Sequence, residues 1–221
     1  MIGTLGSSRS SWGSDLIAAC WGLWGLVWLA GAVYGARHSP AVARRGLPST
    51  MWLGVIVVAW LVLRALPAGD WSALTVHAGW LRALGAVVLV GSTAFTLWAR
   101  VVLGRMWSSA AVIRDAHELR TTGPYAVTRH PIYTGMLGML LGSVVVAGLG
   151  RWTAVFLLGA VLVLVKARAE ERLLADAFGA RYAAYRVHTA MLVPGVRLGR
   201  RRRKGHSGAG DGAGDRPGSS S

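Results

Sequence analysis

The sequence predicts an all-α integral membrane fold, with about five transmembrane helices and a C-terminal helical hairpin that extends into the cytoplasm. The chain has 221 residues, is 53% hydrophobic and has a mean hydropathy of +0.46, which is too apolar for an ordinary soluble domain. Its apolar residues form runs that approach the roughly 20 residues needed to cross the hydrocarbon core of a bilayer. Its cations lie in the connections and in the tail.

Five apolar segments are the candidate crossings. The final segment is short, but apolar residues continue beyond it at helical spacing, so we expect the last helix to leave the membrane and run on as an amphipathic helix to about Arg186. Gly179 is expected to loosen that helix. The first segment is interpreted as a retained helix, because only Arg9 precedes it and no convincing small-residue cleavage site is present. The segments are about Asp15 to Ala36, Thr50 to Leu66, Gly79 to Leu103, Ile132 to Leu149 and Trp152 to Val165.

Loop charges predict the orientation, because cytoplasmic connections carry an excess of lysine and arginine. The second connection has no cation before Arg82, and the turn near Gly148 to Gly150 has only Arg151. The first connection, the third connection and the carboxyl tail are rich in arginine. We therefore expect the amino terminus outside, the carboxyl terminus in the cytoplasm and the protein in the cell membrane.

We interpret residues 1–198 as a single membrane-embedded domain, with its motif-bearing part at 101–194, and residues 199–221 as a basic and then disordered tail. The net charge of +15 is spread over loops and tail, which suits anionic lipid headgroups better than nucleic acid. Cys20 is the single cysteine, so no internal disulfide is possible. The histidines are scattered, and no metal site is expected.

Two polar clusters border the last two apolar runs. In the first, Gly123-Pro124 favours a tight turn and Pro131 suits the first position of a helix. Arg129 and His130 then sit at a helix start, where free N–H groups favour an anionic group. Tyr125 and Tyr133 can flank a flat heterocycle or donate hydrogen bonds.

The second cluster is Lys166, Arg168, Glu170 and Glu171. Each cluster alone has an ordinary interpretation: arginine and tyrosine anchor helices at membrane interfaces, and Lys166 can pair with an acidic residue four positions later on a solvated helix. Together, however, they are brought to the same membrane surface by one short hairpin. Charged groups at that boundary are costly unless paired, so their combination indicates a functional pocket.

The motifs as a set resemble those of the isoprenylcysteine carboxyl methyltransferase family and its phospholipid-methyltransferase relatives. The resemblance covers roughly Val101 to Pro194. It rests on LGRMWS at Leu103 to Ser108, His117-Glu118-Leu119, GPY and RHPIYTG between Gly123 and Gly135, Glu170-Glu171, Phe178-Gly179 with Tyr182 and Tyr185, and Val193-Pro194.

The resemblance implies an integral membrane enzyme that uses S-adenosylmethionine and methylates a membrane-associated acceptor, such as an isoprenylcysteine-like carboxylate, a lipid amine or a small thiol. It assigns the cofactor to Gly123, Pro124, Tyr125, Arg129, His130, Pro131, Tyr133, Glu170 and Glu171. The candidate catalytic residues are Arg129, Lys166 and Glu170.

One residue departs from the family pattern. Enzymes that act on prenylated cysteine often carry arginine four residues before the glutamate pair, where this chain has Lys166. Lysine cannot form the same planar fork with a carboxylate, which puts a carboxylate acceptor in doubt. Arg64, within the second apolar run, is a further candidate polar contact, although snorkelling explains it as well.

Two other functions fit parts of the sequence. A nicotinamide-dependent membrane reductase of the sterol-reductase type can show a similar RHP element, but it would need more basic residues for a nucleotide phosphate. A non-enzymatic membrane protein is the second, although the sequence shows no inverted repeat of broken helices of the kind found in transporters. Binding of S-adenosylmethionine or of a reduced dinucleotide separates these possibilities.

Overall fold

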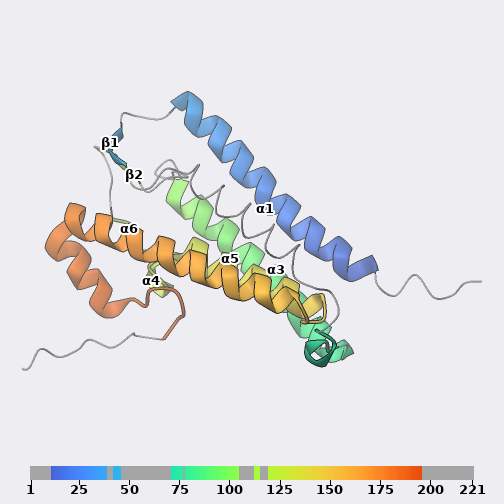
Figure 1. Cartoon of the computed structure of the whole chain (residues 1–221). Helices are drawn as coiled ribbons and strands as arrows, with labels where there is room; N and C mark the ends of the chain where they lie inside the picture. The colour runs from blue at the N-terminus through green and yellow to red at the C-terminus, as the bar shows by residue number, and fades with distance from the viewer. Residues whose placement is uncertain are drawn as a thin grey trace, which may run out of the picture.

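The computed structural model describes residues 11–38, 42–45, 71–76, 78–104, 112–114 and 119–195. Within these residues the protein is mostly helical (Figure 1). The helices are α1 (Ser11–His38), α3 (Gly79–Leu103), α4 (Pro124–Val127), α5 (Pro131–Val146) and α6 (Trp152–His188), with a short 3-10 helix η1 (Ser72–Leu74). The predicted crossing at Thr50 to Leu66, Arg64, residues 105–108 of the LGRMWS motif, Glu118 and the tail at 199–221 lie outside the described residues.

Three of these helices are long and apolar enough to cross a membrane, namely α1 over Trp12–Tyr34, α3 over Gly79–Leu103 and α6 over Trp152–His188. Helix α5 is apolar but has only 16 residues, and at 1.5 Å per residue it is about 24 Å long, less than the roughly 30 Å of a hydrocarbon core. The helical membrane fold is therefore supported, whereas the count of five crossings stays a prediction.

Helices α3 and α5 form the most extensive helix pair, and small residues allow their close approach. A Cβ atom placed on Gly142 of α5 would lie 2.6 Å from the backbone nitrogen of Leu89 and 2.8 Å from the carbonyl oxygen of Gly85 in α3. Because hydrophobic burial does not drive helix association inside lipid, such backbone proximity is a main source of packing energy there.

Helix α1 joins this pair through one small core and two polar contacts. Cys20 of α1, Leu89 of α3 and Met139 of α5 are buried together. The Trp21 indole nitrogen donates a hydrogen bond to Ser143 Oγ at 3.0 Å. Near the start of α1, the Arg82 guanidinium lies 5.0 Å from the centre of the Trp12 ring. These contacts hold α1 to the bundle.

A short ladder, absent from the all-α prediction, links two connections that are far apart in the sequence. Strand β1 (Val42–Arg45) pairs antiparallel with β2 (Val112–Arg114). The strands follow α1 and α3 respectively, so both helices end at the same end of the bundle (Figure 1). The loop-charge argument requires this arrangement, because it assigns both connections to the cytoplasm.

Helix α6 runs on past its apolar part, as predicted, and is broken at Gly179. This residue has φ 49° and ψ −121°, which are not helical angles. In Figure 1 the chain turns back sharply near this point, so residues 180–188 form a separate short helical arm. The arm is followed by a buried segment at 189–192, and both return toward the start of α5.

Candidate active site

The GPY and RHP motifs build two consecutive helix starts. Gly123 has φ 61° and immediately precedes Pro124, the first residue of the single-turn helix α4, so the predicted turn is present and uses a backbone conformation that favours glycine. Pro131 begins α5 and His130 occupies the position before it, as predicted for a proline that lacks an amide proton. Arg129 and His130 are therefore held between two short, rigid elements.

The segment after α6 closes against these helix starts as an extended chain. The Arg129 amide donates to the Ala190 carbonyl at 2.8 Å, and the His130 amide donates to the Met191 carbonyl at 3.2 Å. Thr134 Oγ1 donates to the Leu192 carbonyl at 2.6 Å. Sequence periodicity could not reveal this pairing, because residues some 60 positions apart provide its partners.

Arg129 ties three segments together through one guanidinium group. Its Nε donates to Glu171 Oε1 at 2.6 Å, and the two side chains are only 10% and 11% exposed. Its Nη1 donates to the carbonyls of Arg186 at 3.2 Å and Thr189 at 2.9 Å. The predicted basic and acidic clusters are thus in direct contact, and the arginine joins the start of α5 to α6 and to the arm beyond Gly179.

Glu170 has a separate set of neighbours. The Tyr133 hydroxyl donates to Glu170 Oε1 at 2.5 Å. His130 Nδ1 lies 3.7 Å from Glu170 Oε2, and the His130 and Tyr133 rings stack with their centroids 5.6 Å apart. Lys166 Nζ lies 5.4 Å from the centre of the Tyr133 ring, a cation–π geometry. Two of the three candidate catalytic residues, Lys166 and Glu170, therefore contact the Tyr133 side chain.

Two buried polar atoms next to Glu171 have no hydrogen-bond partner among the described residues. They are His130 Nε2 and the Tyr182 hydroxyl. His130 Nε2 is 3.7 Å from Glu171 Oε1. The Tyr182 hydroxyl is close enough to the Glu171 carboxylate for a weak interaction, but it does not have the geometry of a normal hydrogen bond to any described group. Buried polar groups are normally paired, so these atoms mark a place suited to a ligand or an ordered water.

Tyr125 is fixed through the arm. The Tyr185 hydroxyl donates to the Tyr125 carbonyl at 2.5 Å. Burial is the main cause that raises the pKa of the Tyr125 phenol, and the neighbouring Tyr185 and Glu170 raise it further. A phenol is protonated at physiological pH even without such a shift, so the Tyr125 hydroxyl can act as a hydrogen-bond donor.

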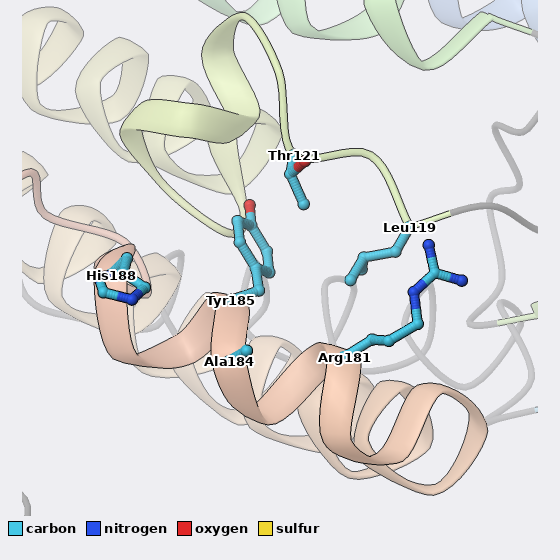
Figure 2. A pocket seen from close by; sticks show the side chains of 6 residues that line it. All are labelled: Leu119, Thr121, Arg181, Ala184, Tyr185 and His188. Atoms are coloured by element: carbon cyan, nitrogen blue, oxygen red, sulfur yellow. The ribbon is translucent and has the colours of Figure 1, made fainter.

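A shallow pocket of about 430 Å³ lies beside Tyr185, between the arm and the chain that leads into α4. Figure 2 shows Tyr185 pointing from the arm toward the chain near α4, with the pocket between the arm and the preceding loop. Its lining residues are Leu119, Thr121, Arg181, Ala184, Tyr185 and His188. It contains none of the predicted site residues.

The predicted site residues fall into two groups. Arg129, His130, Tyr133, Glu170 and Glu171 are joined by the contacts above, with Lys166 at their edge. Gly123, Pro124 and Pro131 shape the backbone around them, and Tyr125 is held by Tyr185. Tyr182 was not predicted as a site residue. The signal was present, because Tyr182 belongs to the motif that follows Phe178-Gly179, but its burial against Glu171 depends on the break at Gly179.

Within the part of the chain that the structure describes, no group of three or more His, Cys, Asp or Glu side chains is arranged so that it could hold a metal ion.

The contact between Arg129 and the glutamate pair lies within a segment of the chain that is similar to known proteins. Residues 83–176 match the model of the isoprenylcysteine carboxyl methyltransferase (ICMT) family. The chain is also 36% identical over 105 residues to the cobalt-zinc-cadmium resistance protein CzcN of Cupriavidus metallidurans, and 34% identical over 107 residues to the nickel-cobalt-cadmium resistance protein NccN of Alcaligenes xylosoxydans xylosoxydans.

These two matches span 43% and 45% of this chain, and each spans 45% of the relative. The family match contains Arg129, His130, Lys166 and the glutamate pair, and it confirms the resemblance seen in the motifs. Segment 83–176, which contains most of α3, all of α4 and α5 and most of α6, is therefore similar to the isoprenylcysteine carboxyl methyltransferase family.

Proposed function

We propose that the protein is an S-adenosylmethionine-dependent methyltransferase that acts on a membrane-associated acceptor. The observation that carries the proposal is the contact between the RHP cluster and the glutamate pair, inside the segment that matches a family of membrane methyltransferases. Neither cluster alone would support it, because interfacial arginines and solvated acidic pairs are common. Their burial together, at about 10% exposure, is not expected of simple anchors.

The residues at this position fit the proposed cofactor. Glu170 and Glu171 supply carboxylates for its amino group and ribose hydroxyls, while Tyr133 and Tyr125 supply flat or hydrogen-bonding surfaces for adenine. His130 Nε2 and the Tyr182 hydroxyl are buried and lack partners, so a polar ligand would satisfy them. Arg129 already binds Glu171 and two carbonyls, and we assign it mainly to holding the carboxylate in place.

The chemistry requires positioning more than proton transfer. S-adenosylmethionine, when bound, supplies a methyl group on a sulfonium centre, which is open to in-line attack. The chain has to align the acceptor with that methyl group and exclude water, and effective molarity provides most of the rate enhancement in such a reaction. Lys166, Glu170 and Arg129 are the candidates for this task, with the Lys166 ammonium over the Tyr133 ring.

The acceptor and the orientation remain parts of the proposal. An isoprenylcysteine-like carboxylate, a lipid amine and a small thiol are all compatible with a site at the end of the bundle where α3 and α6 leave their apolar stretches. We place that end in the cytoplasm on the basis of the loop charges. The two relatives are named for metal resistance. We do not infer a role in metal resistance for this chain from those names.

The test is cofactor binding by purified protein in nanodiscs, followed by incubation with methyl-labelled cofactor and a whole-cell lipid and thiol extract. Glu170→Gln and Glu171→Gln keep side-chain volume and remove charge. Each is expected to weaken binding of S-adenosylmethionine by about 1.5–3 kcal/mol, the scale of a hydrogen bond to a charged group. Asp176→Asn, an exposed acid on the same helix, is the matched control and should bind like the parent.

The proposal is wrong if the parent binds a reduced nicotinamide dinucleotide and not S-adenosylmethionine, which would favour the reductase. It is also wrong if both glutamine variants bind the cofactor as tightly as Asp176→Asn does. Mass spectrometry of the labelled products would then identify the acceptor if methyl transfer occurs.

A further inference from the structure

The Tyr182 hydroxyl is the least explained polar group in the candidate site. Its side chain is 1% exposed, and no described group lies in hydrogen-bonding geometry with the hydroxyl. Leaving a buried hydroxyl unpaired costs stability that a phenylalanine would not cost. A tyrosine at such a position therefore suggests a partner that is not part of the protein chain.

Tyr185 provides the contrast, because it lies one turn further along the same arm. Its hydroxyl donates to the Tyr125 carbonyl at 2.5 Å and so has a structural role in docking the arm. Both residues follow the break at Gly179 and are carried by the same short helix. The two hydroxyls thus differ mainly in whether a described residue supplies a hydrogen-bond partner.

The neighbouring groups define what the missing partner must do. Glu171 Oε1 already accepts from Arg129 at 2.6 Å, whereas Oε2 faces the Arg186 guanidinium at the longer distance of 3.7 Å. A carboxylate can only accept hydrogen bonds, and the phenol of Tyr182 can donate one. A ligand group that donates to Glu171 and accepts from Tyr182 fits both, and a hydroxyl does so. An ammonium group has no lone pair with which to accept.

We infer that Tyr182 and Glu171 together recognise a ligand hydroxyl, and that in the proposed function this is a ribose hydroxyl of S-adenosylmethionine. The inference rests on the proposed function. It makes Tyr182 a binding residue and assigns Glu171, rather than Glu170, to the ribose. His130 Nε2, 3.7 Å from Glu171 Oε1, borders the same place and is available to a second hydroxyl.

The experiment compares Tyr182→Phe with Tyr185→Phe in two measurements. The first is unfolding of the ligand-free protein in detergent. Tyr182→Phe should leave the unfolding midpoint unchanged or raise it, because it removes an unpaired buried hydroxyl, whereas Tyr185→Phe should lower the midpoint because it removes a hydrogen bond. The second is the affinity for S-adenosylmethionine and for its 2′-deoxy and 3′-deoxy analogues.

For the parent, at least one deoxy analogue should bind about 5- to 10-fold more weakly than S-adenosylmethionine, the range expected for loss of one hydrogen bond. Tyr182→Phe should bind S-adenosylmethionine more weakly by a similar factor. It should no longer distinguish S-adenosylmethionine from that deoxy analogue, because the phenol that recognises the ribose hydroxyl has been removed. Tyr185→Phe should keep it.

Two results would overturn the inference while leaving the proposed function intact: Tyr182→Phe lowers the ligand-free midpoint as much as Tyr185→Phe does, or it binds S-adenosylmethionine and both analogues as the parent does. In either case the Tyr182 hydroxyl has a hydrogen-bond partner within the protein or in a water molecule, and it does not recognise the ligand. If the parent binds none of the three compounds, the proposed function and the inference both fail.

Discussion

Replacing Arg129 with alanine should destabilise the protein more than any other single charge removal at this site. The change deletes the bond from Nε to Glu171 and the two bonds from Nη1 to backbone carbonyls. It leaves Glu171 at 11% exposure, with Arg186 at 3.7 Å as its nearest remaining cation. Removing one partner of a buried ion pair typically costs about 3–5 kcal/mol, because the other charge stays buried and uncompensated.

Arg186 is the matched comparison. Its side chain is 49% exposed, and its distance to Glu171 Oε2 is 3.7 Å, so solvent screens the pair and Arg186→Ala should cost about 1 kcal/mol or less. The double variant Arg129→Ala with Glu171→Ala should be less destabilised than the sum of the two single variants, because it leaves no stranded charge. Arg129→Lys should fall in between, since lysine keeps the charge but cannot reach three acceptors in a planar fork.

The assay is reversible unfolding in mixed micelles, followed by circular dichroism as the denaturing detergent is increased. A loss for Arg129→Ala no larger than that for Arg186→Ala would refute the reasoning, because the buried contact at 2.6 Å would then contribute no more than an exposed one. Additive effects in the double variant would likewise show that Arg129 and Glu171 act independently.

Two glycines give further predictions. Gly142→Ala should cost about 1–3 kcal/mol in the same assay, because its new Cβ would meet backbone atoms of α3 that cannot move aside; Gly91→Ala, with nothing within 4 Å of the added Cβ, is the control and should be neutral or stabilising. Gly179→Ala also meets no neighbouring atom, so its expected cost of about 1–3 kcal/mol comes from the backbone angles alone. It should also weaken cofactor binding, since a straighter α6 would withdraw the arm; cofactor binding equal to the parent would show that the arm does not belong to the site.

Local pattern was sufficient to predict the long helices but did not always locate their ends. The run at Gly79 to Leu103 was predicted with the bounds that α3 has, because apolar residues continue to Leu103 and Gly104 follows with φ 54°. Helix α5 was predicted to reach Leu149 and ends at Val146. Hydropathy does not distinguish an apolar helix from an apolar turn, and Gly148, Leu149 and Gly150 all have positive φ, which ends the helix early.

The contact between the two polar clusters was predictable because a short turn joins the two helices that carry them. What the sequence could not provide was the third side of the site, the arm and the segment at 189–192. That segment is held by backbone hydrogen bonds from Arg129 and His130 to Ala190 and Met191, and backbone groups are the same in every residue. The β1–β2 ladder was missed for the same reason.

The position of Gly179 connects these observations. A helix continued without a break beyond Phe178 would carry Tyr182, Tyr185 and Arg186 further from the bundle, at 1.5 Å per residue along a straight axis. The non-helical angles of Gly179 instead turn the arm back, so that Tyr185 reaches the Tyr125 carbonyl, Arg186 approaches Glu171 and the Tyr182 hydroxyl is buried beside the same carboxylate. The sequence showed this glycine only as a weak point in a helix. In the fold it is the residue that completes the candidate site, because the groups it brings back are the ones that enclose Glu171.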